Sequence, residues 1–219
     1  ALLLLLATIT VAGPPAVEGY SDPGAFRGKL QSLAKSKLVS YSALARTLGG
    51  NDVGLLTVGT GKVDEKPAVL LVAGVNPIRP VDSEVLLRVA QRLVKAAETD
   101  AEIRGLLDRV TIYVIAQAAP DAVEAFFAKP LEQREVNLRP IDDDTDGQTD
   151  EDGPDDLNGD GLITVMRVED AAGKYITHPG DDRVMIEADP KKGEHGRYTL
   201  YVEGRDNDGD GRLNEDPPG

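Results

Sequence analysis

The chain has 219 residues, with 38 acidic and 24 basic side chains and a formal net charge of −14. It contains no cysteine, which excludes disulfides, thiolate-ligated metals, lipid anchoring through cysteine and a cysteine nucleophile. Its two histidines, His178 and His195, leave few candidates for imidazole chemistry.

The N-terminal segment, ALLLLLATITVAG, is typical of the hydrophobic core of a signal peptide. It is too short to span a bilayer as a helix, and Gly13-Pro14-Pro15 interrupts regular structure directly behind it. We therefore expect residues 1–16 to be a signal-peptide remnant, cut on its N-terminal side, of a secreted or periplasmic protein. A buried N-terminal strand is the alternative interpretation.

Residues 17–140 have the pattern of an α/β layer with a mixed sheet. Phe26, Leu30 and Leu33 lie at helical spacing and predict a surface helix over 23–37. The later elements are expected as strands over 39–48, 53–58 and 68–73, helices from 82 or 83 to 97 and over 101–109, a strand over 110–117 and a helical turn over 120–129. Gly49-Gly50-Asn51-Asp52 predicts a hairpin between the first two strands.

The stretch from Ala68 to Ala97 is expected to be the centre of this layer. The continuous apolar run 68–73 predicts a strand buried on both faces, and Asp82 or Ser83 is expected to cap the helix that follows. The predicted core face of that helix comprises Val85, Leu86, Val89, Ala90, Leu93, Val94 and Ala97. The loop 74–81 leaves the carboxyl end of the strand, where ligands bind in open α/β sheets.

The composition changes at Pro140, and residues 141–219 are predicted to be a small antiparallel β insert bearing Asp-rich loops. Strand candidates lie over 163–168, 174–177, 183–187 and 197–202, with both histidines in loops. Ten acidic and no basic residues lie over 142–160, and five acidic residues and one arginine over 206–216. These two runs account for the whole net charge, which argues against nucleic acid binding and favours bound cations.

Three copies of one motif occupy these runs: the first acidic loop (142–152), the middle acidic loop (156–164) and the third acidic loop (206–216). Oxygens at motif positions one, three and five converge on a hard cation, glycine at six permits a sharp turn, and oxygens at seven and nine complete the shell. The predicted calcium ligands are Asp142, Asp144, Asp146, Gln148, Asp150, Asp156, Asn158, Asp160, Leu162, Thr164, Asp206, Asp208, Asp210, Arg212 and Asn214, the residues at position seven acting through main-chain carbonyls.

None of the copies has a glutamate at position twelve, so Asp152 and Asp216, one residue earlier, are expected to substitute for it. The loops resemble dockerin-type or thrombospondin-type calcium loops, which implies a structural role. A disordered acidic linker is the alternative.

Four segments carry a wider resemblance: Gly19-Tyr20, then 70–75 (LLVAGV) with 83–88 (SEVLLR), then 119–122 (APDA), then 137–140 (NLRP) before the acidic loops. Together they resemble the zinc carboxypeptidases (carboxypeptidase A-like metallopeptidases), in a bacterial subgroup with such an insert. The resemblance implies the N-terminal part of a mixed-sheet α/β sandwich of that type, incomplete here, with zinc and a peptide or peptide-like ligand.

In that family the central strand ends in Gly-φ-His-x-x-Glu, where φ is apolar and the His and Glu bind zinc. Counting back from Glu84, these positions are Asn76 and Arg79 here, and neither is a suitable zinc ligand. The family's carbonyl-polarising arginine corresponds to Arg134 or Arg139, for which surface arginines are the alternative. The third zinc ligand, the Asn-Arg clamp and the catalytic Glu are expected beyond Gly219.

Three functions follow as hypotheses. The first is a secreted zinc-carboxypeptidase-like hydrolase framework with calcium loops and no peptidase activity of its own. The second is a non-catalytic descendant that binds peptides or cell-wall fragments, with Arg79 contacting an anionic ligand. The third is an insert acting as a calcium-dependent adhesion or assembly module.

Overall fold

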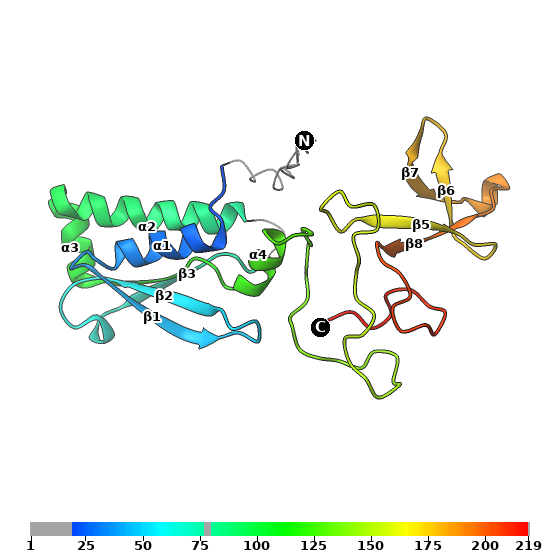
Figure 1. Ribbon diagram of the computed structural model, residues 1–219. Helices are drawn as coiled ribbons and strands as arrows, with labels where there is room; N and C mark the ends of the chain where they lie inside the picture. The colour runs from blue at the N-terminus through cyan, green and yellow to red at the C-terminus, as the bar shows by residue number, and fades with distance from the viewer. Residues whose placement is uncertain (1–18, 77–79, 219) are drawn as a thin grey trace, which may run out of the picture.

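The computed structural model of the protein describes residues 19–76 and 80–218. Figure 1 shows two lobes, an α/β lobe that contains α1 to α4 and a smaller lobe built on β5 to β8. The predicted signal-peptide remnant and Arg79 lie outside the described residues. Among the helices of the described ranges, none is long and apolar enough to cross a membrane.

The α/β lobe has the predicted order of elements. It comprises α1 (Pro23–Leu33), β1 (Val39–Arg46), β2 (Asp52–Val58), the 3-10 turn η1 (Val63–Glu65), β3 (Ala68–Val72), α2 (Val81–Thr99), α3 (Ala101–Arg109), β4 (Thr111–Ile115) and α4 (Pro120–Phe126). The sheet order is β1-β2-β4-β3, with β3 parallel to β4 and the other pairs antiparallel. This confirms the predicted α/β fold with a mixed sheet.

Local sequence signals explain the first elements. Asp22 caps α1 by accepting a hydrogen bond from the N–H of Ala25, and Pro23 occupies the first turn, where a missing N–H costs nothing. The predicted hairpin joins β1 and β2, where the N–H of Thr47 donates to the carbonyl of Asn51 at 2.8 Å.

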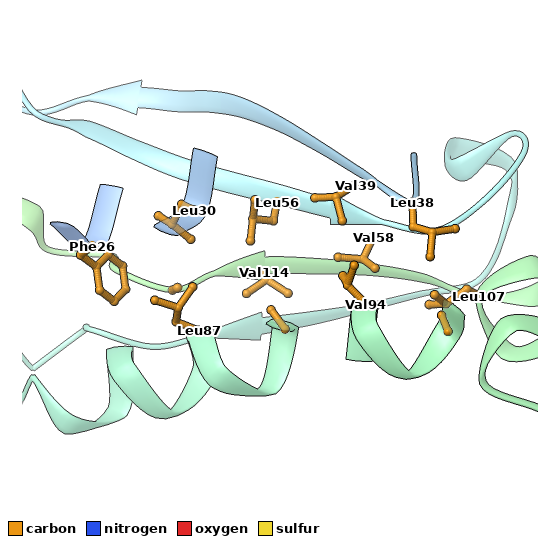
Figure 2. Packing of buried hydrophobic residues seen from close by; sticks show 13 residues of the cluster. Phe26, Leu30, Leu38, Val39, Leu56, Val58, Leu87, Val94, Leu107 and Val114 are labelled. Carbon is orange, nitrogen blue, oxygen red and sulfur yellow. The ribbon is translucent and has the colours of Figure 1, made fainter. Parts of the chain in front are cut away.

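The hydrophobic core lies between one face of the sheet and the helices. Figure 2 shows Phe26 and Leu30 of α1 and Leu87 and Val94 of α2 packed with side chains of the strands. The strand residues of this core include Val39, Leu56, Val58 and Val114. Helices and strands from most of the α/β lobe therefore share one hydrophobic core.

The prediction that the strand over 68–73 is buried on both faces is wrong. β3 lies at the edge of the described sheet, and the helices cover only one face. Leu71 packs against the core, whereas Leu70 on the opposite face is 58% exposed. A strand is buried on both faces only where a layer covers each face, and among the described residues the helices cover one face of this sheet.

The predicted core face of α2 is only partly correct. Ala90, Val94 and Ala97 are buried as expected, but Leu87 is 1% exposed and Val85 is 54% exposed. The helix begins at Val81 after Pro80, so the predicted caps Asp82 and Ser83 lie inside its first turn. The helix is therefore rotated, so that Leu87 faces the sheet and Val85 and Val89 face outward.

The second lobe confirms the predicted antiparallel insert. Its strands are β5 (Val165–Glu169), β6 (Tyr175–His178), β7 (Asp181–Glu187) and β8 (Tyr198–Val202), in the order β5-β8-β6-β7, with the 3-10 turn η2 (Pro190–Lys192) before β8. His178 ends β6 instead of lying in a loop, and it is exposed, as is His195. The pairs β5–β8, β6–β7 and β6–β8 are antiparallel, as the short strands and tight turns predict.

Asp121, in the first turn of α4, joins the β1–β2 hairpin to that helix. Its carboxylate accepts hydrogen bonds from the hydroxyl of Thr47, the side-chain amide of Asn51 at 2.9 Å and the N–H of Gly49 at 2.9 Å. Burial alone raises the pKa of Asp121, but these hydrogen bonds and nearby Arg134 outweigh it and hold the pKa below its usual range.

We predict that Asp121→Asn lowers the melting temperature at pH 7, because the hairpin loses charged hydrogen bonds, each worth about 1.5–3 kcal/mol. Because folding lowers the pKa of Asp121, its carboxylate stabilises the folded state at pH values above the unfolded pKa of about 3.9. This stability is lost as the pH falls through the lower pKa of the folded state. The wild type should therefore lose more stability between about pH 5 and pH 2 than the variant. Thermal melts across this range measure both effects, with exposed Glu98→Gln as control. Equal melting temperatures of wild type and variant at pH 7 would contradict this role.

Candidate functional site

The first candidate site is the loop that leaves β3 at its carboxyl end. Gly74 has φ of +66°, and a Cβ there would lie 2.6 Å from Oγ of Ser83 and 2.9 Å from Cα of Gln117. Only glycine fits this close approach between the loop, α2 and the segment after β4.

Asp82 fixes the same loop to the start of α2. Its carboxylate accepts hydrogen bonds from the N–H of Gly74 at 3.0 Å and from the N–H of Ser83 at 2.7 Å. Nearby, the buried Glu84 accepts a hydrogen bond from the N–H of Ser21 at 2.8 Å and so ties the segment before α1 to α2. The framework around the loop is therefore well defined by its polar contacts.

The loop does not supply a suitable zinc donor set. Asn76 is exposed and follows β3 by four residues, and the position of Arg79 lies outside the described residues. An amide oxygen is a poor zinc ligand, and a guanidinium repels a cation. Among the described residues, the clusters of three or more potential ligands lie in the acidic loops and not here.

A cavity of about 640 Å³ adjoins this loop. It is bounded by Val75 after β3, by residues 118–122 after β4, by Thr47 and Leu48 of the hairpin and by residues 135–138. The carboxyl ends of the two parallel strands therefore open into a cleft, as expected for a ligand site in an open sheet.

The two arginines proposed from the sequence flank the segment 135–138. Arg134 makes a two-point ion pair with Glu132, with Nη2 to Oε2 at 2.9 Å and Nε to Oε1 at 3.1 Å. Its guanidinium is thus already bound, whereas Arg139 is exposed. Of the two, Arg139 therefore offers the more accessible side chain to a ligand.

The acidic loops form the second candidate site, and all three copies have the same turn. The position-one aspartate accepts a hydrogen bond from the N–H of the position-six glycine in each copy, at 3.0 Å for Gly147, 2.9 Å for Gly161 and 2.9 Å for Gly211. These glycines have φ of +99°, +85° and +95°. The repeated motif therefore encodes one repeated conformation.

The side chains at positions one, three and five gather as the spacing predicts in the first acidic loop. Carboxylate oxygens of Asp142, Asp144 and Asp146 all lie within 4.8 Å of one another. A second cluster joins Asp144 to Asp208, Asp210 and Glu215 of the third acidic loop, again within 4.8 Å. The first and third acidic loops are therefore neighbours, which the sequence repeat did not predict.

A buried carboxylate from outside each loop clamps its main chain. Asp152 of the first loop accepts hydrogen bonds from the N–H of Asn207 at 3.0 Å and of Asn214 at 2.6 Å in the third loop. In return, Asp216 of the third loop accepts one from the N–H of Asp143 at 2.9 Å. The structure thus places Asp152 and Asp216, expected as late ligands of their own loops, across the junction between the two loops.

The middle acidic loop is clamped in the same manner by Glu203, directly after β8. Its carboxylate accepts hydrogen bonds from the N–H groups of Leu157 at 2.9 Å, Asn158 at 3.2 Å and Thr164 at 3.2 Å, and from the Thr164 hydroxyl at 2.8 Å. The Thr164 hydroxyl is the largest of the effects that lower the pKa of Glu203. Glu203 therefore remains an anion that holds the loop closed.

Glu151 and Glu215 are functional candidates that sequence reasoning missed. Each precedes a clamping aspartate, at position ten of its loop, and each has both carboxylate oxygens buried. No N–H or hydroxyl group of the described residues donates to these oxygens, and their close neighbours are carboxyl groups, Asp216 for Glu151 and Asp152 for Glu215. The neighbouring Asp216 raises the pKa of Glu151 to about 7, and burial together with Asp152 raises the pKa of Glu215 to about 7. The sequence did offer one signal for them, because both glutamates occupy the same position of the repeat. Glu203 had no such signal, because its partners lie 39 to 46 residues away.

The sequence of the α/β lobe matches a known protein family. The sequence model described as zinc carboxypeptidase matches residues 29–145, just over half of the chain. No protein of curated function matches the chain. Among solved structures, a metallo-carboxypeptidase from Burkholderia cenocepacia is 27% identical with a TM-score of 0.42, covering 47% of this chain and 27% of its own.

Two further structures are similar at lower identity. Carboxypeptidase A from Helicoverpa armigera is 21% identical with a TM-score of 0.40, over 45% of this chain and 24% of its own. Bovine thrombin-activatable fibrinolysis inhibitor is 11% identical with a TM-score of 0.46, over 59% and 40%. The matched part of this chain thus spans about a quarter to two fifths of these proteins, and the family assignment rests on the sequence match. On that match, this chain belongs to the zinc carboxypeptidase family.

Proposed function

We propose that this chain is an N-terminal part of a secreted, carboxypeptidase-like protein that does not hydrolyse peptides through zinc as it stands. The observation that carries the proposal is the pair Asn76 and Arg79 at the two positions where the family's first zinc ligands belong. The leader-like run at residues 1–13 supports secretion.

In the family, zinc supplies a polarised water for attack on a peptide bond. The donors in this chain do not fit that ion, because an amide and a guanidinium replace an imidazole and a carboxylate. What the chain retains is the positioning framework: Gly74 and Asp82 shape the loop, and the cavity lies beside it. This framework binds and orients a ligand without an activated water.

We predict that the purified chain, dialysed against equimolar zinc, retains no stoichiometric zinc and releases no C-terminal residue from a peptide. Metal analysis and a peptide-hydrolysis assay measure the two results. The control is Asn76→Ala, which should be identical to the wild type in both assays. Equimolar zinc that is lost in Asn76→Ala, or hydrolysis that a chelator abolishes, would contradict the proposal.

The acidic loops are proposed as structural calcium sites. Support comes from the shared turn of the three copies, from the two carboxylate clusters and from the clamps that hold each loop closed. Calcium takes six to eight oxygen ligands, and carboxylates and carbonyls at these positions provide them. Bound calcium would stabilise the insert by binding the folded state only.

We predict that millimolar calcium raises the melting temperature of the chain relative to the same protein in EDTA, and that magnesium has a smaller effect. The reason is that each site filled at about 100 times its Kd adds about 2.7 kcal/mol to the free energy of unfolding. Differential scanning calorimetry measures the shift. Identical melting temperatures in calcium and EDTA would refute the structural role, whereas calcium-dependent capture of a partner would favour an adhesion module.

A second candidate function is the binding of peptides or cell-wall fragments in the cleft. The cavity of about 640 Å³ at the carboxyl ends of β3 and β4 favours it, because such a cavity is large enough for a short peptide end. Arg79, at the place of an acidic zinc ligand, is proposed to contact the carboxylate of that ligand.

If Arg79 has this role, Arg79→Ala should weaken the binding of peptides with a free C-terminal carboxylate by at least about tenfold, the effect of one lost charged hydrogen bond. Isothermal titration with a peptide and with its C-terminal amide separates charge recognition from general affinity. Exposed Arg88→Ala on α2 serves as the control. Unchanged affinity of Arg79→Ala for the free carboxylate would exclude this function for Arg79.

A further inference from the structure

We infer that the first and third acidic loops form one paired centre for two divalent cations of the calcium type, in which Glu151 and Glu215 are ligands and each loop completes the other. This inference rests on the proposed calcium binding and goes beyond it, because the sequence repeat predicts three independent sites. It assigns a ligand role to two glutamates that no motif position marks, and it separates the middle acidic loop from the other two.

The first observation is an exchange of equivalent contacts. Asp152 accepts the N–H of Asn207 at 3.0 Å, and Asp216 accepts the N–H of Asp143 at 2.9 Å. Asp143 and Asn207 occupy position two of their loops, and both acids occupy position eleven. An antiparallel bridge joins Asp152 directly to Asp216. The two loops are thus related by an approximate two-fold arrangement, and neither clamp exists without the other loop.

A further hydrogen bond between the loops involves motif position nine of the third loop. The N–H of Asn214 donates to Asp152 at 2.6 Å, so Asp152 holds both the start and the late segment of the third loop. In the opposite direction, the N–H of Asp143 at the start of the first loop donates to Asp216. Removing either loop would take away the acceptors of these partly buried hydrogen bonds, so we expect the two loops to fold as a unit.

The second and independent observation is a set of buried carboxylate oxygens to which no group of the described residues donates a hydrogen bond. Asp216 is 1% exposed, and its Oδ2 has no hydrogen-bond partner among residues 19–76 and 80–218. Both oxygens of Glu151 and of Glu215 are also buried without partners in the same part of the chain. A buried carboxylate is stable only if it is paired with a proton, a donor or a cation, and for these adjacent carboxylates we propose the cation.

Glu215 belongs to one of the two clusters of potential metal ligands, and Glu151 lies beside a member of the other. Glu215 lies within 4.8 Å of Asp208 and Asp210 of its own loop and of Asp144 of the first loop. Glu151 lies beside Asp146 of its own loop and Asp216 of the third loop. Each glutamate therefore sits between acids of both loops. A glutamate in this place can bind a hard cation through both oxygens, which replaces the absent position-twelve residue.

The middle acidic loop provides an internal contrast. Its position ten is Val165, and its clamp Glu203 belongs to neither of the other loops. Both oxygens of Glu203 accept hydrogen bonds, so this acid is satisfied without a cation. The middle loop is therefore expected to bind its cation independently, and the paired loops to bind theirs cooperatively.

The test is a calcium titration of the full chain by isothermal calorimetry, comparing wild type with Glu151→Gln and with Glu215→Gln. Either single change should weaken both paired sites together by at least about tenfold, since one lost ligand in one loop disorders the clamp of the other. Asp160→Asn in the middle loop is the matched variant and should remove one independent site only. Exposed Glu187→Gln should titrate as wild type.

A second measurement tests whether the variants still fold. In calcium-free buffer both glutamine variants should melt no lower than wild type, because each removes one acid from a group of mutually repelling acids. A lower melting temperature there would mean a purely structural role for the glutamate and would overturn the ligand assignment. If each variant weakens only one site, the pairing is wrong although calcium binding stands. If the wild type binds no calcium, the inference fails together with the proposed loop function.

Discussion

The burial of carboxylates against one another is the constraint on which the acidic half of this protein depends. Asp152 and Asp216 are almost fully buried, and the two acidic runs around them carry the whole net negative charge. Main-chain N–H groups from the opposite loop satisfy part of this charge, and Glu151 and Glu215 have no donors among the described residues. The loops can be compact only where something neutralises these acids. A hard cation does so while also using the oxygens that the turn of each loop gathers.

The α/β lobe presents the opposite situation, because its framework is present while, as we propose, its zinc ligands are not. Gly74, Asp82 and the parallel strands β3 and β4 build the loop and the adjoining cavity. We propose that Asn76 and Arg79 stand at the zinc positions, and the clusters of potential metal ligands among the described residues lie in the insert. Fold and chemistry are thus separable in this chain: backbone geometry is specified by glycines and packing, whereas catalysis requires particular donors at two positions.

The amino-acid pattern predicted most of what depends on local structure. Helix α1, the β1–β2 hairpin, the four strands of the insert and the turns of the acidic loops all follow from spacing and turn residues. Prediction failed where tertiary neighbours decide. β3 has an apolar sequence, but the described helices cover only one of its faces, and Leu87 replaces Val85 in the core because α2 is rotated against the sheet. The pairing of the first and third loops and the clamp by Glu203 depend on contacts between distant segments, which no local motif encodes.

These findings describe a carboxypeptidase-family chain whose proposed metal-binding chemistry resides in the insert. Diffraction from crystals soaked in calcium and zinc together, recorded above and below the zinc absorption edge, locates each ion separately. The account predicts calcium density between the first and third acidic loops, in contact with Glu151 and Glu215, and no zinc peak at Asn76. A zinc peak beside Asn76, or ordered acidic loops without any bound cation, would contradict it.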